Sequence, residues 1–384
     1  MNLQRVTTLV LKEWREIVRD RVFFLLAFIM PVAWMVVFGY GMNMDTVNIP
    51  FAVLDQDHSA MSREYANHYI DSRYFSFKGY LPDTHEGDRL LRAGKLRLVL
   101  VIPPRFEQDL KARRTVAIQS LLDGTFAYRV RGIAGYVDAI NRDANSALQV
   151  QQLTERFGMP PSRAQVMVQP IHLEVRYLFN QALRSIWSVA PSLIMFTMMV
   201  SPAVLTSLSV VREKETGSIY NIYASTVTRA EYLLGKLLPN IMISTVNTMV
   251  LWLIATLHFG APFKGSLLFF FIASVVYVSC TCSIGFLVST LVRTQGSALL
   301  ITVILAIVPA VQFSGMFTPV AFLPDSSRLL AHLFPPMYYN NIVQGTFLKG
   351  TGWAILWSDV LFLAVYAAGL LLASYAVFRK RTPS

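Results

Sequence analysis

The sequence predicts a membrane protein with an all-α domain of six transmembrane helices and an α/β domain inserted between helices 1 and 2. Its 384 residues are 54% hydrophobic and only 15% charged, and the mean hydropathy is +0.46. This composition lies outside the range of ordinary soluble proteins. A helix needs roughly 20 apolar residues to cross the hydrocarbon core of a bilayer. Runs of that length lie at 22–42, 187–210, 237–258, 266–291, 298–318 and 354–378.

Residues 1–21 predict an amphipathic helix at the membrane interface, with Trp14 at headgroup depth. Basic side chains lie on its other faces, and the apolar residues at helical spacings are Leu3, Val6, Leu9, Val10, Trp14 and Ile17. A basic lead-in that only fixes topology is the simpler alternative. The first transmembrane helix, 22–42, is longer than the apolar core of a signal peptide, so we expect it to be a retained anchor.

Residues 43–185 alternate strand-like runs with helical ones, which predicts an α/β domain. Asp57 or Ser59 is expected to cap the first helix, and Gly94 to end the second. The domain has no cysteine and must be stable on its own core. Strands are expected at 48–54, 74–77, 96–102, 116–122 and 171–176, and helices at 59–72, 84–93, 106–113 and 126–156.

Residues 187–378 are nearly all apolar and are expected to hold transmembrane helices 2–6, with two interruptions. One is the charged segment 212–236. The other is 319–352, where prolines and glycines prevent one continuous helix. Its apolar residues favour short re-entrant helices over a solvated loop, because non-helical backbone at membrane depth must be covered by protein or line a cavity. Residues 379–384 form a short tail.

The distribution of lysine and arginine predicts both termini in the cytoplasm. Short flanks on one side carry basic clusters within 5–21 and 212–236 and after the last span, whereas the other side's short loops offer only Lys264, Arg328 and Lys349. Because lysine and arginine are retained on the cytoplasmic side, residues 43–185 are expected outside it. The net charge of +11 is then mainly a topology signal, and nucleic-acid binding is not expected.

The sequence offers no catalytic residues, nucleotide site or metal site. It contains no Gly-x-x-x-x-Gly-Lys-[Ser/Thr] phosphate loop, its six histidines are scattered, and Cys280 and Cys282 are its only cysteines. Asp55-Gln56-Asp57-His58 is explained more simply as a strand-end turn and helix cap than as a cation site. Charged residues are absent from spans two to five, which argues against an ion-driven carrier.

The most informative local feature is Arg212-Glu213-Lys214-Glu215-Thr216-Gly217, at the end of the second apolar run. Consecutive charges cannot enter hydrocarbon, because each costs about 2.5 to 3.5 kcal/mol on an insertion scale. The segment must therefore lie in water and present a fixed pattern of charge to something. Farther along the chain, Arg229-Ala230-Glu231-Tyr232-Leu233-Leu234-Gly235-Lys236 forms a second charged cluster.

Together these features resemble the transmembrane subunit of a type-2 ATP-binding-cassette exporter. The shared features are an interfacial N-terminal helix, a first span, a large outer domain, an Arg-Glu-x-Glu-x-Gly stretch and a broken fifth segment. The outer domain, with Ala52–Asp57 and Leu98–Phe106, is similar to the periplasmic domain of the bacterial multidrug-efflux branch. One departure is Ser225-Thr226, which stands where the family usually has Ser-Pro.

The resemblance implies that a partner ATPase binds ATP and Mg, that this chain is no enzyme and binds no cofactor, and that a coupling surface joins the two. It also implies a second permease subunit, identical or not, facing this one through spans two and five around a cavity. The coupling residues are Lys12, Arg15, Arg212, Glu213, Lys214, Glu215 and Gly217. Flexible methionine and aromatic surfaces suit varied apolar ligands, and the lining candidates are Met195, Phe196, Met199, Val311, Gln312 and Met316.

We therefore expect a permease subunit in the bacterial inner membrane that exports drugs or other hydrophobic or amphiphilic compounds. ATP hydrolysis in the partner would drive the export. Membrane lipid, a periplasmic adaptor and an outer-membrane channel are further expected partners. Export of lipid, peptide or sodium is an alternative within transport. A membrane-anchored receptor or scaffold, whose outer domain senses a ligand, is the alternative from a different class.

Overall fold

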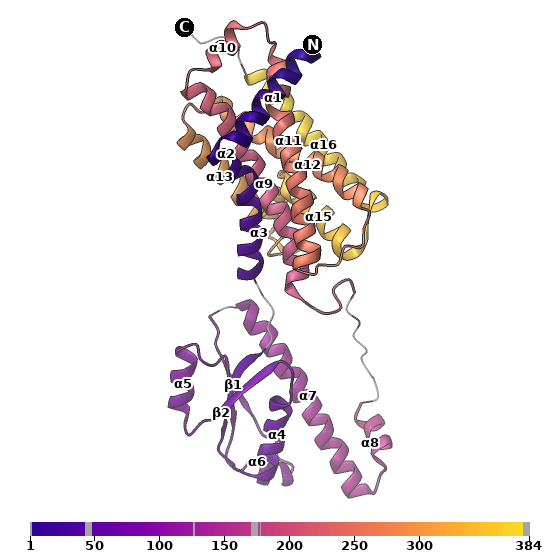
Figure 1. Ribbon diagram of the computed structural model, residues 1–384. Coiled ribbons are helices and arrows are strands. Elements are labelled where there is room, and N and C mark those ends of the chain that lie inside the picture. Colours follow the sequence, from indigo (N-terminus) through magenta and orange to yellow (C-terminus); the bar gives the residue numbers. More distant parts are fainter. Residues whose placement is uncertain (1, 43–47, 126, 170–175, 177, 379–384) are drawn as a thin grey trace. The chain divides into compact units, whose positions relative to one another are not determined.

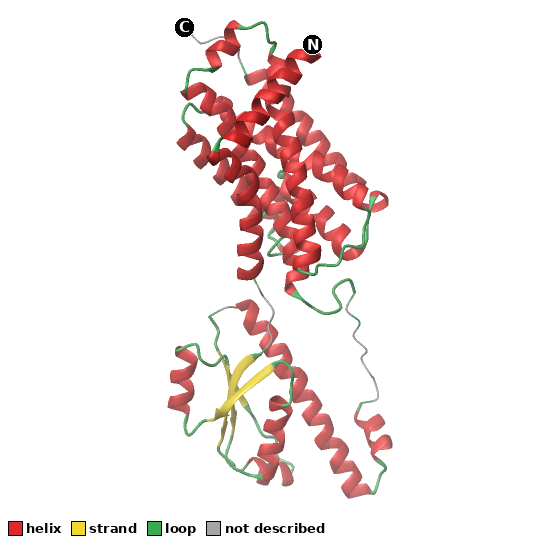
Figure 2. Cartoon of the chain, viewed as in Figure 1, coloured by secondary structure: helices red, strands yellow, loops and turns green. Residues whose placement is uncertain are grey.

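The computed structural model describes residues 2–42, 48–125, 127–169, 176 and 178–378 (Figure 1). The chain forms two compact units. The smaller is Met44–Arg176, and the larger joins Met1–Asn43 to Tyr177–Ser384. Every described strand belongs to the smaller unit, whereas the described elements of the larger one are helices (Figure 2).

The smaller unit is built on a four-stranded sheet with the order β2-β1-β3-β4. β1 pairs in parallel with both β2 and β3, with Phe51 opposite Leu98, and β4 runs antiparallel to β3. The central strands are buried on both faces, which explains their nearly continuous apolar sequences. The strands are β1 (Ile49–Asp55), β2 (Phe75–Tyr80), β3 (Leu98–Ile102) and β4 (Gln119–Leu122).

Helices cover both faces of this sheet. Phe51 and Leu100 pack on one face with Tyr69 of α4 and Phe106 of α6, whereas Val99 packs on the other face with α5. The strands and helices expected between 48 and 156 are thus present, but α8 was not expected. Residues 171–175 of the expected last strand lie outside the described residues. The helices are α4 (Ala60–Ile70), α5 (Thr84–Arg92), α6 (Phe106–Lys111), α7 (Ala127–Phe157) and α8 (Pro161–Val168).

The larger unit contains six helical stretches that are long and apolar enough to cross a membrane. They are Arg21–Gly41, Ser185–Glu215, Arg229–His258, Leu267–Leu291, Gln295–Gln312 and Trp353–Val377. The first joins α2 (Arg21–Phe24), a π-helical turn and α3 (Met30–Gly41); the others contain α9 (Ser185–Glu215), α11 (Arg229–Leu253), α12 (Leu267–Leu291), α13 (Gln295–Gln312) and α16 (Trp353–Val377). Helix α1 (Leu3–Arg19) precedes them, and α10 (Ile219–Ala224) lies between α9 and α11.

Two of these helices have bounds that differ from those expected. α13 was expected at 298–318, but it ends at Gln312, and Gly315 soon after adopts a φ of +81°. Only glycine adopts such a backbone conformation readily. α11 was expected to begin at 237, but it begins at Arg229 because Thr228 and Glu231 form a capping box.

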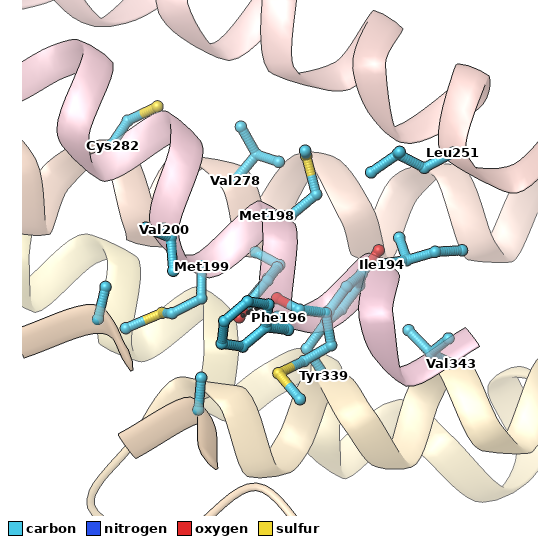
Figure 3. Packing of buried hydrophobic residues seen from close by; sticks show 14 of the residues in the cluster. Ile194, Phe196, Met198, Met199, Val200, Leu251, Val278, Cys282, Tyr339 and Val343 are labelled. Carbon is cyan, nitrogen blue, oxygen red and sulfur yellow. Dashed lines mark hydrogen bonds between the residues drawn. The ribbon is translucent and has the colours of Figure 1, made fainter. Parts of the chain in front are cut away.

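Helix α9 is the core of the larger unit. In an apolar segment of 18 residues of α9, 94% of the residues are buried within the chain, compared with 28% in the corresponding segment of α13 and 22% in that of α16. Figure 3 shows Ile194 and Met198 of α9 among side chains of neighbouring helices. α12 approaches closely, because a Cβ added at Gly285 would lie 2.1 Å from the carbonyl oxygen of Ala203. α3, α11, α12, α13 and α15 (Pro335–Gln344) all pack against α9, whereas α16 packs against α12 and α15.

The broken segment 319–352 consists of short helices, as expected. α14 (Asp325–Ala331) is followed by α15 (Pro335–Gln344), which begins with two prolines in its first turn, where their missing N–H groups cost nothing. α15 is buried and polar contacts hold it in place. Asn340 donates to the Ser314 carbonyl oxygen at 3.1 Å and accepts from the Ser192 hydroxyl at 2.8 Å, and the Gln344 amide donates to the same hydroxyl at 2.7 Å.

Candidate functional site

The charged stretch Arg212–Glu215 forms the last turn of α9 and is followed by Thr216 as the C-cap. Successive side chains on a helix point about 100° apart, so the stretch directs its charges toward different neighbours. Gly217 follows with a φ of +73° and redirects the chain toward α10. We use the name charge hub for Arg212–Glu215, the residues that they contact, and Glu13 and Glu16, which pair with two of those contacting residues.

Arg212 joins α9 to the junction between α1 and α2. Its Nη1 donates to Asp20 Oδ2 at 2.6 Å, and its guanidinium lies 5.2 Å from the centre of the Phe23 ring. Asp20 also caps α2 by accepting from the N–H groups of Val22 and Phe23. Burial acts to raise the pKa of Asp20, but the hydrogen bonds from Arg212 and these N–H groups outweigh it, so the pKa is lowered.

Glu213 is the most enclosed of the charged residues in the stretch and joins α9 to α1 and α11. Its Oε1 accepts from Lys12 Nζ at 2.6 Å and lies 3.3 Å from Lys236 Nζ. Its Oε2 accepts from the Tyr232 hydroxyl at 2.8 Å. Lys236 also donates to Glu13 and to the Ser209 carbonyl oxygen. Glu213 is 5% exposed and Lys236 4%, so these charges depend on one another for compensation.

Lys214 and Glu215 hold the two sides of the turn between α12 and α13. Lys214 Nζ donates to carbonyl oxygens at the end of α12, those of Ser289, Thr290 and Val292. Glu215 accepts from the backbone N–H of Gln295, the first residue of α13, at 2.7 Å and from its side-chain amide. A cation at a helix C-terminus and an anion at an N-terminus both match the helix dipole. The last carbonyls and first N–H groups of helices also lack partners within the helix.

Helix α1 is docked along its length on the start of α11. The backbone N–H of Asn2 donates to Glu231 Oε1 at 2.6 Å, and Arg5 donates to the Thr226 carbonyl oxygen at 2.8 Å. A Cβ added at Gly235 would lie 2.6 Å from Leu9 Cβ, so glycine permits the close approach. The apolar residues expected on one lipid-facing surface are therefore divided. Val6 and Ile17 are buried against the protein, and Trp14 is exposed.

Three carboxylates of the hub, on Glu13, Glu16 and Glu213, have oxygens within 4.8 Å of one another. Such a group could attract a metal ion, but two ammonium groups are already among them. Lys12 Nζ lies 2.6 Å from Glu213 and 3.5 Å from Glu16, and Lys236 contacts Glu13 and Glu213. Burial raises the pKa of Glu13, although Lys236 acts in the opposite direction. The lysines thus supply the positive charge that a metal would provide.

The six candidates for a substrate cavity do not share an exposed surface within this chain. Met195 is 0% and Met199 1% exposed, and Phe196 is buried beside them (Figure 3). Val311 and Met316 are partly buried against the same core, whereas Gln312 is exposed. The two methionines of α9 are therefore packing residues in this arrangement, because α9 is enclosed by the chain's own helices.

Sequence reasoning missed the partners that complete the hub. Asp20, Glu13, Tyr232 and Gln295 were not among the candidate residues, and Lys236 was noted only as part of a motif. One signal was available, because the capping box at Thr228 places Tyr232 and Lys236 four residues apart on the same face of one helix. Nothing local in the sequence indicates that this face meets Glu213.

Known permeases are similar in sequence to this protein over nearly the whole chain. The sequence is 29% identical to the probable multidrug ABC transporter permease YbhS of Escherichia coli strain K12, covering 99% of this chain and 98% of that protein. It is 27% identical to the probable multidrug ABC transporter permease YbhR of the same organism, covering 98% and 99%. It is 25% identical to the inner membrane transport permease YhhJ, also of that strain, covering 99% and 98%.

The family match has the same extent. The sequence model of the ABC-2 family transporter protein matches residues 21–376, from the first residue of α2 to the last turn of α16. The matched segment includes all six candidate membrane spans except the final residue of the last, together with the Arg212–Glu215 stretch. The chain therefore belongs to the ABC-2 family of transporter proteins, as a permease.

Proposed function

We propose that this chain is the permease subunit of an ATP-binding-cassette export system in the bacterial inner membrane, and that it moves drugs or other amphiphilic compounds outward. ABC-2 permeases work with an ATPase subunit, and two relatives are named as probable multidrug permeases. Both termini would face the cytoplasm, where the partner binds ATP and Mg. The smaller unit would lie in the periplasm and hold substrate or dock an adaptor leading to an outer-membrane channel.

The observation that carries this proposal is the charge hub. Arg212, Glu213, Lys214 and Glu215 each bind a different neighbour, so a displacement at one end of α9 reaches α1, α11, α12 and α13 together. α9 is also the most buried of the six spans. A partner that pushes on this end would therefore move the centre of the bundle as a unit.

The partner ATPase would contact the exposed side chains around the hub rather than the hub itself. Glu213 and Lys236 are enclosed, whereas Arg15 of α1 and Tyr220 of α10 are exposed. Gly217 lets the chain turn from α9 into α10, so α10 can act as the coupling helix. Of the proposed coupling residues, Arg212, Glu213, Lys214 and Glu215 would transmit the movement, and Lys12 and Arg15 would receive it.

A second permease subunit would pack mainly against α13. Leu300, Ile304 and Val308 are exposed and four residues apart, which places them on one face of that helix. Gln312 is exposed in this chain, with Val311 and Met316 beside it. A cavity between the α13 faces of two subunits could therefore include Gln312 without any rearrangement of helices. α9 would contribute Met195, Phe196 and Met199 only after the helices rearrange.

The proposal is tested by asking whether an ATPase depends on this chain. We expect an ATP-binding-cassette ATPase to co-purify with the full chain, and drug efflux from cells to require both. Glu213→Gln should reduce efflux at least about tenfold, the change expected when a contact worth about 1.4 kcal/mol is lost. Insertion and co-purification should remain. The matched control is Glu155→Gln, on the exposed surface of α7. Normal efflux in Glu213→Gln would remove the hub from the coupling mechanism.

A further inference from the structure

A cleft at the charge hub has a volume of about 700 Å³ and lies between α1 and the end of α9. Its walls include Leu11, Ile17 and Phe23 as well as basic and acidic side chains, so it combines apolar and charged surface. This size falls within the usual range for small-molecule sites. The cleft includes Lys12 and Arg15, which the proposed function assigns to the coupling surface, so the inference drawn from it rests on that proposal.

The charged side chains that line this cleft are balanced, because four basic residues stand against four acidic ones. Lys236, outside the lining, also pairs with two of these carboxylates, which leaves two of the lining arginines without an acidic partner among the described residues. Lys236 and Lys12 engage Glu13, Glu16 and Glu213, and Arg212 engages Asp20. Arg15 and Arg19 also line the cleft. They are exposed and, within the described part of the chain, have neither an ion pair nor a hydrogen bond. They lie four residues apart on α1, on one face, so both guanidinium groups can reach the same anion.

The cleft lies where the first membrane span begins. Asp20 separates α1 from the apolar stretch Arg21–Gly41, so Arg15 and Arg19 lie within two turns of the start of the span. Apolar side chains are exposed on both sides of this junction. They recur at spacings of three and four and are Leu11, Trp14, Val18, Val22, Leu25 and Ile29. An anion held by the arginines would thus have apolar surface next to it at the membrane boundary.

We propose that this cleft binds the headgroup of an anionic phospholipid, with its phosphate at Arg15 and Arg19 and its acyl chains along the exposed face of the first span. Basic side chains near a membrane surface attract anionic headgroups, and arginine matches the geometry of a phosphate. A soluble acidic segment of a partner protein would use the arginines but would gain nothing from Val22 and Leu25. The apolar surface therefore favours a lipid. The lipid would hold α1 at the membrane surface, so it would act on the part of the chain that receives movement from the ATPase.

The test uses the full chain in bilayer discs of phosphatidylcholine mixed with phosphatidylglycerol, released into the gas phase for native mass spectrometry. Wild-type chain should retain phosphatidylglycerol in preference to phosphatidylcholine. Arg15→Gln and Arg19→Gln should each reduce its occupancy roughly fivefold, the contribution of one basic side chain near an anionic surface. Arg229→Gln, an exposed arginine at the start of α11 outside the cleft, is the matched control and should change little.

Three results would overturn the inference. The first is phosphatidylglycerol occupancy that is the same in wild type and in all variants, or that falls as much in Arg229→Gln as in the Arg15 and Arg19 variants. Either outcome would indicate non-specific attraction. The second is complete displacement by inorganic phosphate, which would mean that the site recognises a free anion. The third is loss of the co-purified ATPase from the Arg15 and Arg19 variants with lipid retention unchanged, which would make the cleft a protein-docking site. A conservative pair, Arg15→Lys and Arg19→Lys, should retain most of the lipid, and an unchanged melting temperature shows that the glutamine variants are folded.

Discussion

In the smaller unit, described ion pairs such as Arg92–Asp88 and Lys111–Glu107 join residues four positions apart on one helix. In the charge hub, Lys236 pairs with Glu13, which is 223 positions away in the sequence. The side chains of Arg92 and Asp88 are 82% and 57% exposed, but those of Lys236 and Glu13 only 5% and 3%. In these examples the same chemical groups form exposed, local pairs on a helix surface in one case and buried pairs between distant helices in the other.

The energetic meaning of a pair depends on this difference. Exposed pairs along a helix contribute little, because water already solvates both charges. A buried pair is costly to assemble, but removing one partner leaves an uncompensated charge in a medium of low polarity. The hub should therefore be fragile to single substitutions, and the helix-surface pairs should not be.

The largest effect is expected for Lys236→Met. This change leaves Glu13 and Glu213 without their shared ammonium group, and breaking a buried pair typically costs about 3 to 5 kcal/mol of unfolding free energy. The measurement is chemical denaturation of the purified chain in detergent, with Lys111→Met on α6 as the exposed control. Adding Glu13→Gln should restore part of the loss. Equal stability of the two lysine variants would contradict the distinction between buried and exposed ion pairs.

A smaller effect is expected for Asp20, whose contribution to the melting temperature should depend on pH. Its lowered pKa means that the pair with Arg212 stabilises the folded chain above the ordinary carboxyl value of 3.8. That stabilisation is lost as the pH falls through the lowered pKa. The melting temperature of wild-type chain should therefore fall more steeply on acidification than that of Asp20→Asn. Asp88→Asn on α5 serves as the control. Parallel curves for wild type and Asp20→Asn would show that the junction between α1 and α2 does not depend on this charge.

The smallest effect is expected for Arg92→Gln. Its partner Asp88 is four residues away on α5 and largely exposed, so the change should lower the unfolding free energy by about 0.3 to 0.5 kcal/mol. The measurement is thermal unfolding of the full chain, with the unfolding transition of the smaller unit compared between wild type and variant. A loss as large as that of Lys236→Met would mean that exposure does not separate the two kinds of pair.

Local features of the fold could be predicted because their causes are local. The apolar runs of β1 and β3, the prolines before α15 and the six long apolar stretches each depend on neighbouring residues. The early start of α11 was equally local, since Thr228 and Glu231 form its capping box, but this signal was overlooked. The end of α13 was placed too late because the residues after Gln312 are apolar although no longer helical.

The arrangement of the hub could not be predicted, because its contacts join residues far apart in the sequence. The charges of Arg212–Glu215 are expected to lie outside hydrocarbon, and Glu213 finds its partners on α1 and α11 rather than at an exposed surface. The central position of α9 was missed for a related reason. A helix surrounded by lipid and a helix surrounded by other helices are both apolar. The sequence around Met195 and Met199 therefore does not show that these side chains are buried against other helices.

The alternation of sign along Arg212–Glu215 has a consequence for the length of α9. One residue inserted before Arg212 would turn the stretch by about 100°, so that each charge would occupy the place of the one after it. Arginine would then meet Lys12 and Lys236, glutamate would meet the carbonyl oxygens that end α12, and lysine would meet the N–H group that begins α13. Three of the four contacts would become unfavourable at once, and Asp20 would lose its arginine. The stretch thus acts as a check on the number of residues in the central helix, and α9 should tolerate neither lengthening nor shortening by one residue.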